Sequence, residues 1–224
     1  MKIINNPANV PEETLEGFLQ AYANDYVRVE GVKGIRVREP KDKVALVVGG
    51  GSGHEPMFAM FVGKNLADAS ANGNIFASPD PNTILQTVRS VECGKGVLLV
   101  YGNYAGDNLN FDMAAELLED FGIESRTVRV WDDIASAPKE RITDRRGIAG
   151  DVFVIKIAGA ATAAGLSLDE AYHVAAKARD NTFSLGVALS GGTIPGAEHA
   201  AFSLPDGEIE FGMGVHGEPG IRRM

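Results

Sequence analysis

The sequence predicts an α/β fold, with a mostly parallel sheet flanked by helices and an antiparallel hairpin near the C-terminus. Three observations lead to this prediction. Short continuous apolar runs, typical of buried parallel strands, alternate with amphipathic segments of helical length. The apolar runs end in glycine-rich or polar loops, which is the usual transition from a strand to a helix. Near the C-terminus, two apolar runs flank the sequence PDGE, which favours a hairpin.

The first half of the chain is predicted to alternate between helix and strand. Pro11–Asp25 is the first predicted helix, because proline suits its first turn, acidic residues follow, and its apolar residues share one face. Val44–Val48 is a continuous apolar run and is predicted to be a buried strand. Glu55–Phe61 is predicted to be a helix with Pro56 in its first turn. Gly96–Tyr101 repeats the pattern of the buried strand.

The second half continues the alternation. Asn110–Phe121 is amphipathic and is predicted to be a helix, and the run SRTVRVW that follows is predicted to be a strand. The remaining predicted elements are the helices Asp151–Ala164 and Leu168–Asp180, the strand Phe183–Leu189 and the hairpin Ala201–Val215. The charged stretch Asp132–Arg146 is predicted to be a mobile connection. No repeat or domain boundary is visible, so residues 1–224 are expected to form one domain.

Composition restricts the classes of partner. The net charge of −9 disfavours nucleic acid and anionic membrane surfaces. The single cysteine, Cys93, allows no internal disulfide, which fits a reducing compartment. No apolar run approaches the roughly 18 residues of a membrane span, and the N-terminus lacks the apolar core of a signal peptide. We therefore expect a cytoplasmic protein that binds neither nucleic acid nor membrane.

Three loops that follow predicted strands carry reactive side chains: Gly49–His54, Gly102–Asp107 and Gly212–Glu218. Ligands of open α/β sheets gather at the carboxyl ends of strands. The glycines of the first loop can present backbone N–H groups to an oxygen-rich ligand. Its spacing fits neither a phosphate-binding Walker loop, nor a dinucleotide fingerprint, nor a serine-hydrolase elbow. The alternative is a tight turn with a solvated His54.

The other two loops also leave alternatives open. Asp107 stands at a strand-to-helix transition and is either a helix N-cap or a general base toward a hydroxyl. His216 is either a structural histidine or a base or nucleophile, because Gly214 and Gly217 give its ring little cover.

A metal site is not expected. The other histidines, His173 in a predicted helix and His199 in a loop, are interpreted as structural or surface residues. A zinc site needs three or four converging ligands, and only distant candidates exist. Asp132 and Asp133 could hold Mg²⁺, but two acids that open a charged loop are usually solvated.

Five motifs occur in an order that resembles the substrate-binding K subunit of dihydroxyacetone kinases. They are GGGSGHEP at Gly49–Pro56, FASP at Phe76–Pro79, NYAGDNLNF at Asn103–Phe111, RRGIAG at Arg145–Gly150 and GVHGEPGI at Gly214–Ile221. The resemblance extends from the N-terminal helix to the last residue. It implies that the chain binds a short ketose, typically dihydroxyacetone.

The resemblance also implies roles for individual residues. His216 would form a covalent hemiaminal with the ketose carbonyl, and His54 and Asp107 would bind its hydroxyls and assist proton transfer. Glycerol has no carbonyl and would not form the adduct. The residues that would line the substrate site are Gly51, Ser52, Gly53, Ser78 and Gly102.

The family pattern implies partners as well. ATP and Mg²⁺ are expected on a separate L component, which is supplied with phosphate by free ATP or by a phosphotransferase-system phosphocarrier protein. The chain alone is expected to bind ketose without phosphorylating it and to form a homodimer. A ketose-sensing transcriptional co-activator is the alternative function, and a structural domain with an incidental pocket is a third.

The sequence departs from the family pattern in two places. Gly102 stands where members commonly carry a lysine, which would alter the pocket or mark a subgroup that acts on a related ketose such as erythrulose. K subunits also continue into a second α/β subdomain beyond the GVHGEPGI motif, and this chain is expected to lack that subdomain.

Overall fold

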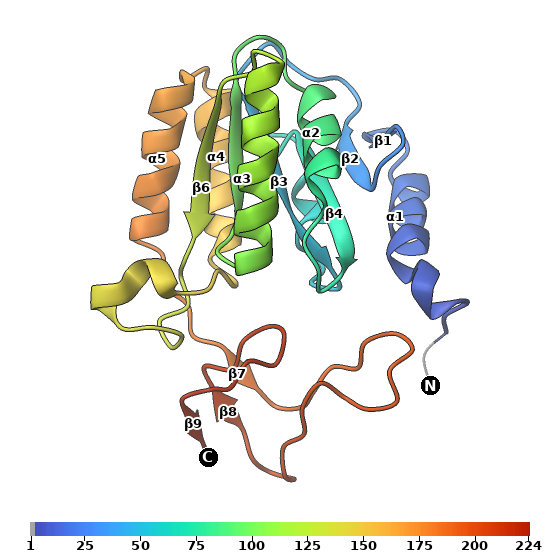
Figure 1. Cartoon of the computed structure of the whole chain (residues 1–224), viewed down its shortest axis with the longest axis vertical. Helices are drawn as coiled ribbons and strands as arrows, with labels where there is room; N and C mark the ends of the chain where they lie inside the picture. Colours follow the sequence, from blue (N-terminus) through green and yellow to red (C-terminus); the bar gives the residue numbers. More distant parts are fainter. Residues whose placement is uncertain (1–2) are drawn as a thin grey trace.

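The computed structural model describes residues 3–224 and contains a six-stranded sheet with helices on both faces (Figure 1). The strand order is β1-β2-β4-β3-β5-β6, in which β4, β3, β5 and β6 run parallel and β1 and β2 add an antiparallel edge. The strands are β1 (Tyr26–Val29), β2 (Gly34–Val37), β3 (Ala45–Ser52), β4 (Ala69–Ile75), β5 (Val97–Gly102) and β6 (Ser125–Val130). The predicted α/β class with a mostly parallel sheet is confirmed.

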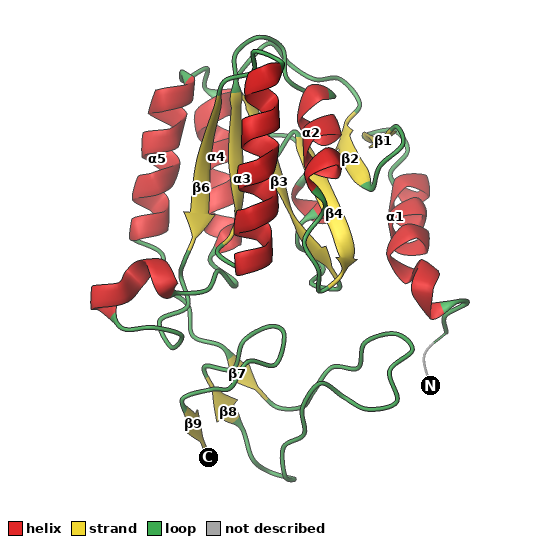
Figure 2. Ribbon diagram, in the orientation of Figure 1, coloured by secondary structure: helices red, strands yellow, loops and turns green. Residues whose placement is uncertain are grey.

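Helices cover the two faces of the sheet unequally (Figure 2). One face packs against α2 and α3, and the other packs against α1, α4 and α5. The helices are α1 (Val10–Ala21), α2 (Pro81–Arg89), α3 (Ala105–Asp120), α4 (Asp151–Ala163) and α5 (Leu168–Asp180), with short 3₁₀ helices η1 (Pro7–Asn9), η2 (Ala59–Phe61) and η3 (Lys139–Asp144).

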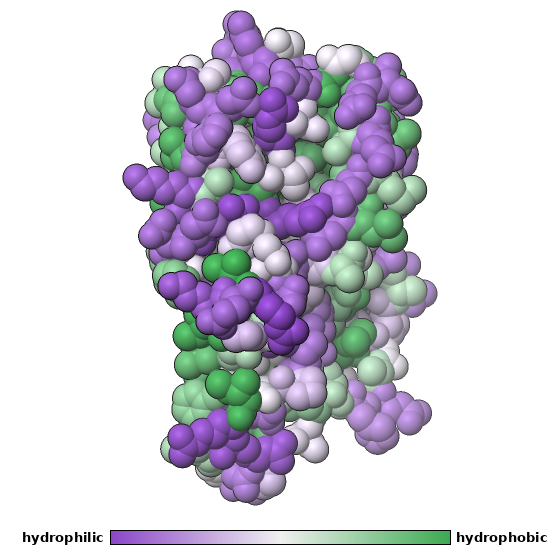
Figure 3. Space-filling model, turned by 60° about the vertical axis from the view of Figure 1, so that its left-hand side comes forward, coloured by the Kyte–Doolittle hydropathy of each residue, from purple (hydrophilic) through white to green (hydrophobic). Residues whose placement is uncertain are grey.

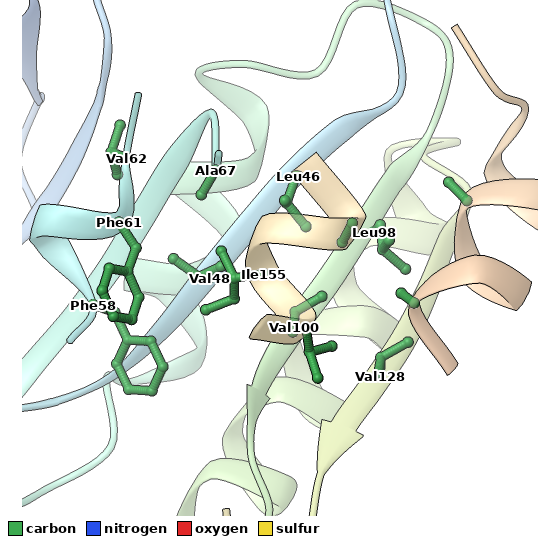
Figure 4. Close-up of a cluster of buried hydrophobic side chains, with 14 of the residues drawn as sticks. Leu46, Val48, Phe58, Phe61, Val62, Ala67, Leu98, Val100, Val128 and Ile155 are labelled. Atoms are coloured by element: carbon green, nitrogen blue, oxygen red, sulfur yellow. The ribbon is translucent and has the colours of Figure 1, made fainter. Parts of the chain in front are cut away.

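The buried strands divide their side chains between two hydrophobic cores, because successive residues of a strand point to opposite faces. Figure 4 shows Leu46, Val48, Leu98, Val100 and Val128 on the face that packs against Ile155 of α4. The alternate residues Val47, Leu99 and Tyr101 belong to the core beneath α2 and α3. Each fully buried aliphatic side chain of the two cores stabilises the fold by roughly 1.5–3 kcal/mol.

Several elements escape the sequence prediction. β1 and β2 have four residues each, and β4 has the sequence ASANGNI, which lacks an apolar run. β4 is nevertheless buried, since it pairs with β2 on one side and β3 on the other. Helix α2 is also missed, although Asp80 caps its N-terminus by accepting a hydrogen bond from the Thr83 N–H at 3.0 Å.

Besides differences at the ends of α1, which stops at Ala21 rather than Asp25, and of α3, three predicted elements are replaced or much reduced. The segment Glu55–Phe61 forms turns that end in η2 instead of a helix, because Phe58 turns inward to the core. The strand Phe183–Leu189 shrinks to β7 (Val187–Ala188). The hairpin Ala201–Val215 is absent. Instead β8 (Glu210–Phe211) pairs with β7 and with β9 (Arg222–Arg223) in a small antiparallel sheet, so antiparallel pairing is present near the C-terminus but between other strands than predicted.

The stretch after β6 is anchored rather than solvated, which corrects the expectation for Asp132 and Asp133. Both carboxylates are fully buried. Asp132 accepts hydrogen bonds from the backbone N–H groups of Ile148 at 2.9 Å and Gly150 at 2.8 Å. Asp133 forms an ion pair of 2.9 Å with Arg146. The two acids therefore fix the connection between β6 and α4.

We expect Asp132→Ala to lower the free energy of unfolding by about 2–4 kcal/mol, because two buried N–H groups lose their acceptor. Urea denaturation measures this change. Asp144→Ala is the matched control, since its ion pair with Arg141 is exposed, and it should change stability by less than about 0.5 kcal/mol. A change of that small size for Asp132→Ala would show that the two hydrogen bonds do not hold the connection.

The C-terminal segment from β7 onward lies beyond the carboxyl ends of the parallel strands (Figure 1). It exposes several large apolar side chains, among them Val187, Leu189 and Ile221. In the space-filling view, hydrophobic patches in the lower part of the molecule interrupt a mostly hydrophilic surface (Figure 3). Within residues 3–224, no helix is both long and apolar enough to cross a bilayer.

Candidate active site

A cavity of about 500 Å³ lies at the carboxyl ends of the strands, between the sheet and the C-terminal segment. Strands β3 and β5 are neighbours, and the chain continues from β3 to β4 on one side and from β5 to β6 on the other, so the loops after these two strands lead in opposite directions. Such a switch point is where open α/β sheets bind ligands. The volume falls within the range of about 300–1,000 Å³ that is usual for small-molecule sites.

Most of the site residues predicted from the sequence meet in this cavity. Its lining includes Gly51, His54, Ser78, Gly102, Asp107 and His216. Ser52 and Gly53 lie outside it and line a smaller neighbouring cavity of about 240 Å³. The Ser52 hydroxyl is already engaged, since it donates a hydrogen bond to the Gly73 carbonyl at 2.7 Å.

The glycines that end β3 allow two loops to approach each other. A Cβ on Gly51 would lie 2.7 Å from the backbone nitrogen of Ala77, and a Cβ on Gly50 would overlap the ring of Phe58. Side chains at these positions would therefore push away the loop that follows β4, or Phe58 itself. That loop brings Phe76 and Ser78 to the cavity.

His216 is held in a tight turn that starts at Gly214. The Gly214 N–H donates to the Glu218 carbonyl at 3.0 Å, and the Gly217 N–H donates back to the Gly214 carbonyl at 3.0 Å. Gly217 has a φ of +88°, which favours glycine. A Cβ on Gly214 would collide with the carboxylate of Glu218. The sequence of this turn thus fixes where the His216 ring can lie.

Two contacts determine which nitrogen of the His216 ring carries the proton. Nδ1 lies 3.2 Å from Oε1 of Glu218, and Nε2 lies 3.1 Å from Nε2 of His54. Burial acts to raise the pKa of Glu218, but its backbone and His216 lower that pKa overall. An ionised Glu218 accepts a hydrogen bond from Nδ1–H, which leaves a lone pair on Nε2 of His216. His54 then donates its own Nε2–H toward that lone pair.

Aromatic rings cover both histidines. Phe76 stacks on His54 at a centroid distance of 4.7 Å, and Tyr104 meets His216 edge-on at 4.9 Å. Burial, aided by His216, lowers the pKa of His54 to about 4, so His54 is neutral at pH 7. The expectation of an uncovered His216 is wrong, because neighbours distant in sequence supply the cover and leave its side chain 29 % exposed.

Asp107 lies in the first turn of α3 and does not cap it, since Tyr104 occupies the N-cap position. Helix α3 begins at Ala105 rather than at Asn110, so the N-cap alternative for Asp107 is excluded. Its buried Oδ1 has no hydrogen-bond partner among residues 3–224. Burial raises the pKa of Asp107 to about 6, against the opposing influence of Ser78 and His216. This is the pKa range in which a carboxylate acts as a base near neutrality.

The model of the Dak1 domain matches residues 16–224, which is nearly the whole chain. The chain belongs to the Dak1 family. It is 48 % identical over 225 residues to the PTS-dependent dihydroxyacetone kinase 2, dihydroxyacetone-binding subunit DhaK, of Listeria innocua, covering 99 % of this chain and 67 % of that protein. It is also 48 % identical to the L-erythrulose kinase of Pectobacterium atrosepticum, covering 98 % of this chain but 37 % of the relative.

Solved structures of Dak1 relatives have the same fold. The dihydroxyacetone kinase of C. freundii superposes with a TM-score of 0.93 at 37 % identity, over 100 % of this chain and 42 % of that one. The dihydroxyacetone kinase operon co-activator Dha-DhaQ superposes with a TM-score of 0.88 at 32 % identity, over 96 % of this chain and 66 % of the co-activator.

Sequence reasoning missed four residues of this Dak1 site: Phe76, Tyr104, Asp151 and Glu218. Glu218 was visible within the motif HGEPG, two residues after His216. Tyr104 and Phe76 stand inside quoted motifs, but only the fold turns their rings toward the histidines. Asp151 opens a predicted helix and gave no sequence signal of burial, although it is 1 % exposed.

The described part of the chain, residues 3–224, contains no group of three or more His, Cys, Asp or Glu side chains that could hold a metal ion. The histidines outside the site lie on the surface. His173 is exposed on α5, with Nδ1 2.6 Å from the Asp169 carbonyl, and His199 lies in an exposed loop.

Proposed function

We propose that this chain binds a short ketose covalently through His216 and presents a ketose hydroxyl for phosphorylation by ATP held on a separate L component. The observation that carries the proposal is the meeting of His216, His54 and Asp107 in one cavity. This set combines a nucleophilic nitrogen, a hydrogen-bond donor and a base, which are the groups that capture and activation of a hydroxyketone require.

The covalent step uses the lone pair on Nε2 of His216. It attacks the keto carbon, a C–N bond forms, and the C=O π electrons move to the oxygen. The ring loses its Nδ1 proton to Glu218, 3.2 Å away. Glu218 then releases this proton to solvent and the keto oxygen takes up one proton from solvent, so Glu218 returns to its ionised form and charge and protons balance. The neutral Nε2–H of His54, which lies 3.1 Å from Nε2 of His216, donates a hydrogen bond to the new oxygen in this step.

Asp107 acts in the second step. The hemiaminal holds the ketose so that a terminal hydroxyl lies beside the carboxylate, and the reaction becomes effectively intramolecular. Asp107 accepts the hydroxyl proton as the phosphoryl group arrives. The L component supplies ATP and Mg²⁺, which carry the phosphoryl group and neutralise its charge.

Intact-mass spectrometry of the chain tests the capture of ketose. Incubation with dihydroxyacetone or erythrulose should add the mass of one ketose per chain, because addition to a carbonyl releases no leaving group. Incubation with glycerol should add nothing, since glycerol has no carbonyl. An adduct with glycerol, or none with either ketose, would contradict the proposal.

A ketose-sensing co-activator is a second candidate, because the superposition with Dha-DhaQ covers nearly all of this chain. A sensor needs His216 to hold the ketose covalently, but it does not need Asp107 as a base. We favour the kinase role, since the pKa of Asp107 suits a base. Mixing the chain with an L component and ATP separates the two functions. Phosphorylated ketose indicates the kinase, whereas an adduct without phosphate transfer indicates the sensor.

We expect phosphate transfer by the complex to depend on pH through Asp107. Its raised pKa of about 6 means that the carboxylate takes up a proton as the pH falls through 6. At pH 5 the ionised fraction, and with it the rate, should be about tenfold below the plateau near pH 7. Single-turnover rates at pH 5–8 measure this. His54, with a pKa of about 4, should add no inflection in that range, and a flat profile would exclude Asp107 as the base.

The family resemblance leads to two further proposals about partners. We propose that the chain forms a homodimer, which sedimentation equilibrium of the purified chain tests. We also propose that phosphate reaches the L component either as free ATP or from a phosphotransferase-system phosphocarrier protein. Assays of the complex with each donor in turn identify the source.

A further inference from the structure

A buried carboxyl group of the cavity has no role in the proposed reaction. Asp151 lies in the first turn of α4, is 1 % exposed and lines the same cavity as His216. Its Oδ1 has no hydrogen-bond partner among residues 3–224, and it takes part in none of the ion pairs found there. An unsatisfied buried carboxyl destabilises a fold, so its presence calls for a ligand.

Gly102 determines whether that carboxyl can be reached from the cavity. A Cβ on Gly102 would lie 3.1 Å from Oδ2 of Asp151 and 3.4 Å from the carbonyl of Gly147. Any side chain at this position would therefore stand directly against the Asp151 carboxyl. Gly102, Gly147 and Asp151 all line the cavity, so glycine at position 102 leaves open a recess beside Asp151 that a side chain would fill.

The charges around Asp151 favour its protonated form. Burial, together with the nearby carboxylates of Asp132 and Asp107, raises the pKa of Asp151 well above its usual range. A protonated carboxyl has one donor and one acceptor, which is the complement of an alcohol. A cation is a poorer match, since it would have to displace the proton.

Among residues 3–224, Asp151 Oδ1 is one of three buried side-chain oxygens that belong to residues lining this cavity and have no hydrogen-bond partner. The others are Tyr104 Oη and Asp107 Oδ1. Dihydroxyacetone has two hydroxyls besides its carbonyl, whereas a four-carbon ketose has three. The three unsatisfied oxygens therefore equal in number the three hydroxyls of a four-carbon ketose.

We propose that Asp151, in the recess opened by Gly102, binds the additional hydroxyl of a four-carbon ketose, so that the site prefers such a ketose over dihydroxyacetone. This inference rests on the proposed function of His216. It makes Asp151 a residue that determines specificity, separate from the groups that form the adduct and accept the proton.

Adduct titrations with erythrulose and dihydroxyacetone, followed by intact mass, test the proposal. The unchanged chain should bind erythrulose at least about tenfold more tightly, the effect of one hydrogen bond to a buried group. Asp151→Ala should bring the ratio of the two affinities to about one, mainly through weaker binding of erythrulose. Asp151→Asn, which stays uncharged and can still donate and accept, should keep the ratio within about threefold.

Two further variants separate binding from folding. Asp169→Ala removes an exposed aspartate from the first turn of the neighbouring helix α5 and should leave the ratio unchanged. Gly102→Ala fills the recess while leaving Asp151 in place, and should reduce the preference for erythrulose as Asp151→Ala does. If Asp151→Ala does not fold, Gly102→Ala and Asp151→Asn still decide the matter.

The outcomes distinguish a failure of the Asp151 subsite from a failure of the proposed function. If the unchanged chain forms an adduct with dihydroxyacetone but the ratio is the same in Asp151→Ala and Gly102→Ala, the subsite is wrong and the function stands. If the unchanged chain reacts with neither ketose, both fail. An Asp151→Asn chain that behaves like Asp151→Ala would contradict recognition by a protonated carboxyl.

Discussion

His216→Ala is expected to abolish the ketose adduct entirely, because no other side chain in the cavity offers a comparable nucleophile. His54 is the nearest imidazole, but in the arrangement described here its Nε2 carries a proton and points at His216. The mass of the variant after incubation with dihydroxyacetone or erythrulose should equal the mass of the untreated chain. Phosphate transfer with an L component should fall to background, since the hydroxyl is no longer held beside Asp107.

His199→Ala is the control for this experiment. His199 is a histidine in an exposed loop outside the cavity, so its removal should leave the adduct unchanged. Thermal unfolding of both variants checks that the fold persists, which we expect because His216 lies in a surface turn. An adduct of full stoichiometry on a folded His216→Ala chain would refute covalent capture by this residue.

Asp107→Asn is expected to leave covalent capture of the ketose intact and to slow phosphate transfer. The adduct should form as before, because Asp107 takes no part in the attack on the carbonyl. Phosphate transfer with an L component should fall by about 10²–10⁴-fold, the usual contribution of a general base. The same variant should lose the pH inflection near 6. Asp112→Asn, on the exposed side of the same helix, removes only an ion pair with Arg129 and should change neither measurement.

The same substitution should make the protein more stable at pH 7. The pKa of Asp107 rises from 3.8 to about 6 on folding, so the folded state favours the protonated form. Stability from this group is complete at low pH and is lost as the pH rises through 4 to 6. An asparagine avoids that loss, and we expect a gain on the order of 2 kcal/mol at pH 7, measured by urea denaturation. Loss of both transfer and stability would indicate a damaged fold rather than a missing base.

Local sequence patterns predicted the parts of the fold whose burial shows in their own residues. The apolar runs of β3 and β5 identified two of the parallel strands, and the predicted bounds of α4 and α5 match these helices almost to the residue. β4 was not predicted, because its buried positions hold small and polar residues. Only its pairing with β2 and β3 makes it a central strand. The antiparallel pairing near the C-terminus was predicted, but between the wrong strands, because β8 pairs with β7 and β9 rather than with the segment before PDGE.

For the candidate site too, the sequence predicted some features and could not predict others. Residue types and motifs singled out His54, Asp107 and His216, because a histidine among glycines and an acid after a strand are unusual in themselves. Nothing local showed that His54 and His216, 162 residues apart, would meet at 3.1 Å. Nor could the sequence foresee that Ser52 would turn to the Gly73 carbonyl and leave the cavity.

The sequence by itself determined the fold class, the strand ends and the reactive residue types, because hydrophobic periodicity and turn residues act over a few neighbouring positions. The tertiary structure alone decided which loops share a cavity, which rings cover His216 and how far Asp107 and Asp151 are buried. These properties depend on contacts between segments distant in sequence. The pKa of a carboxyl follows its burial and its neighbours, and the sequence gives neither directly.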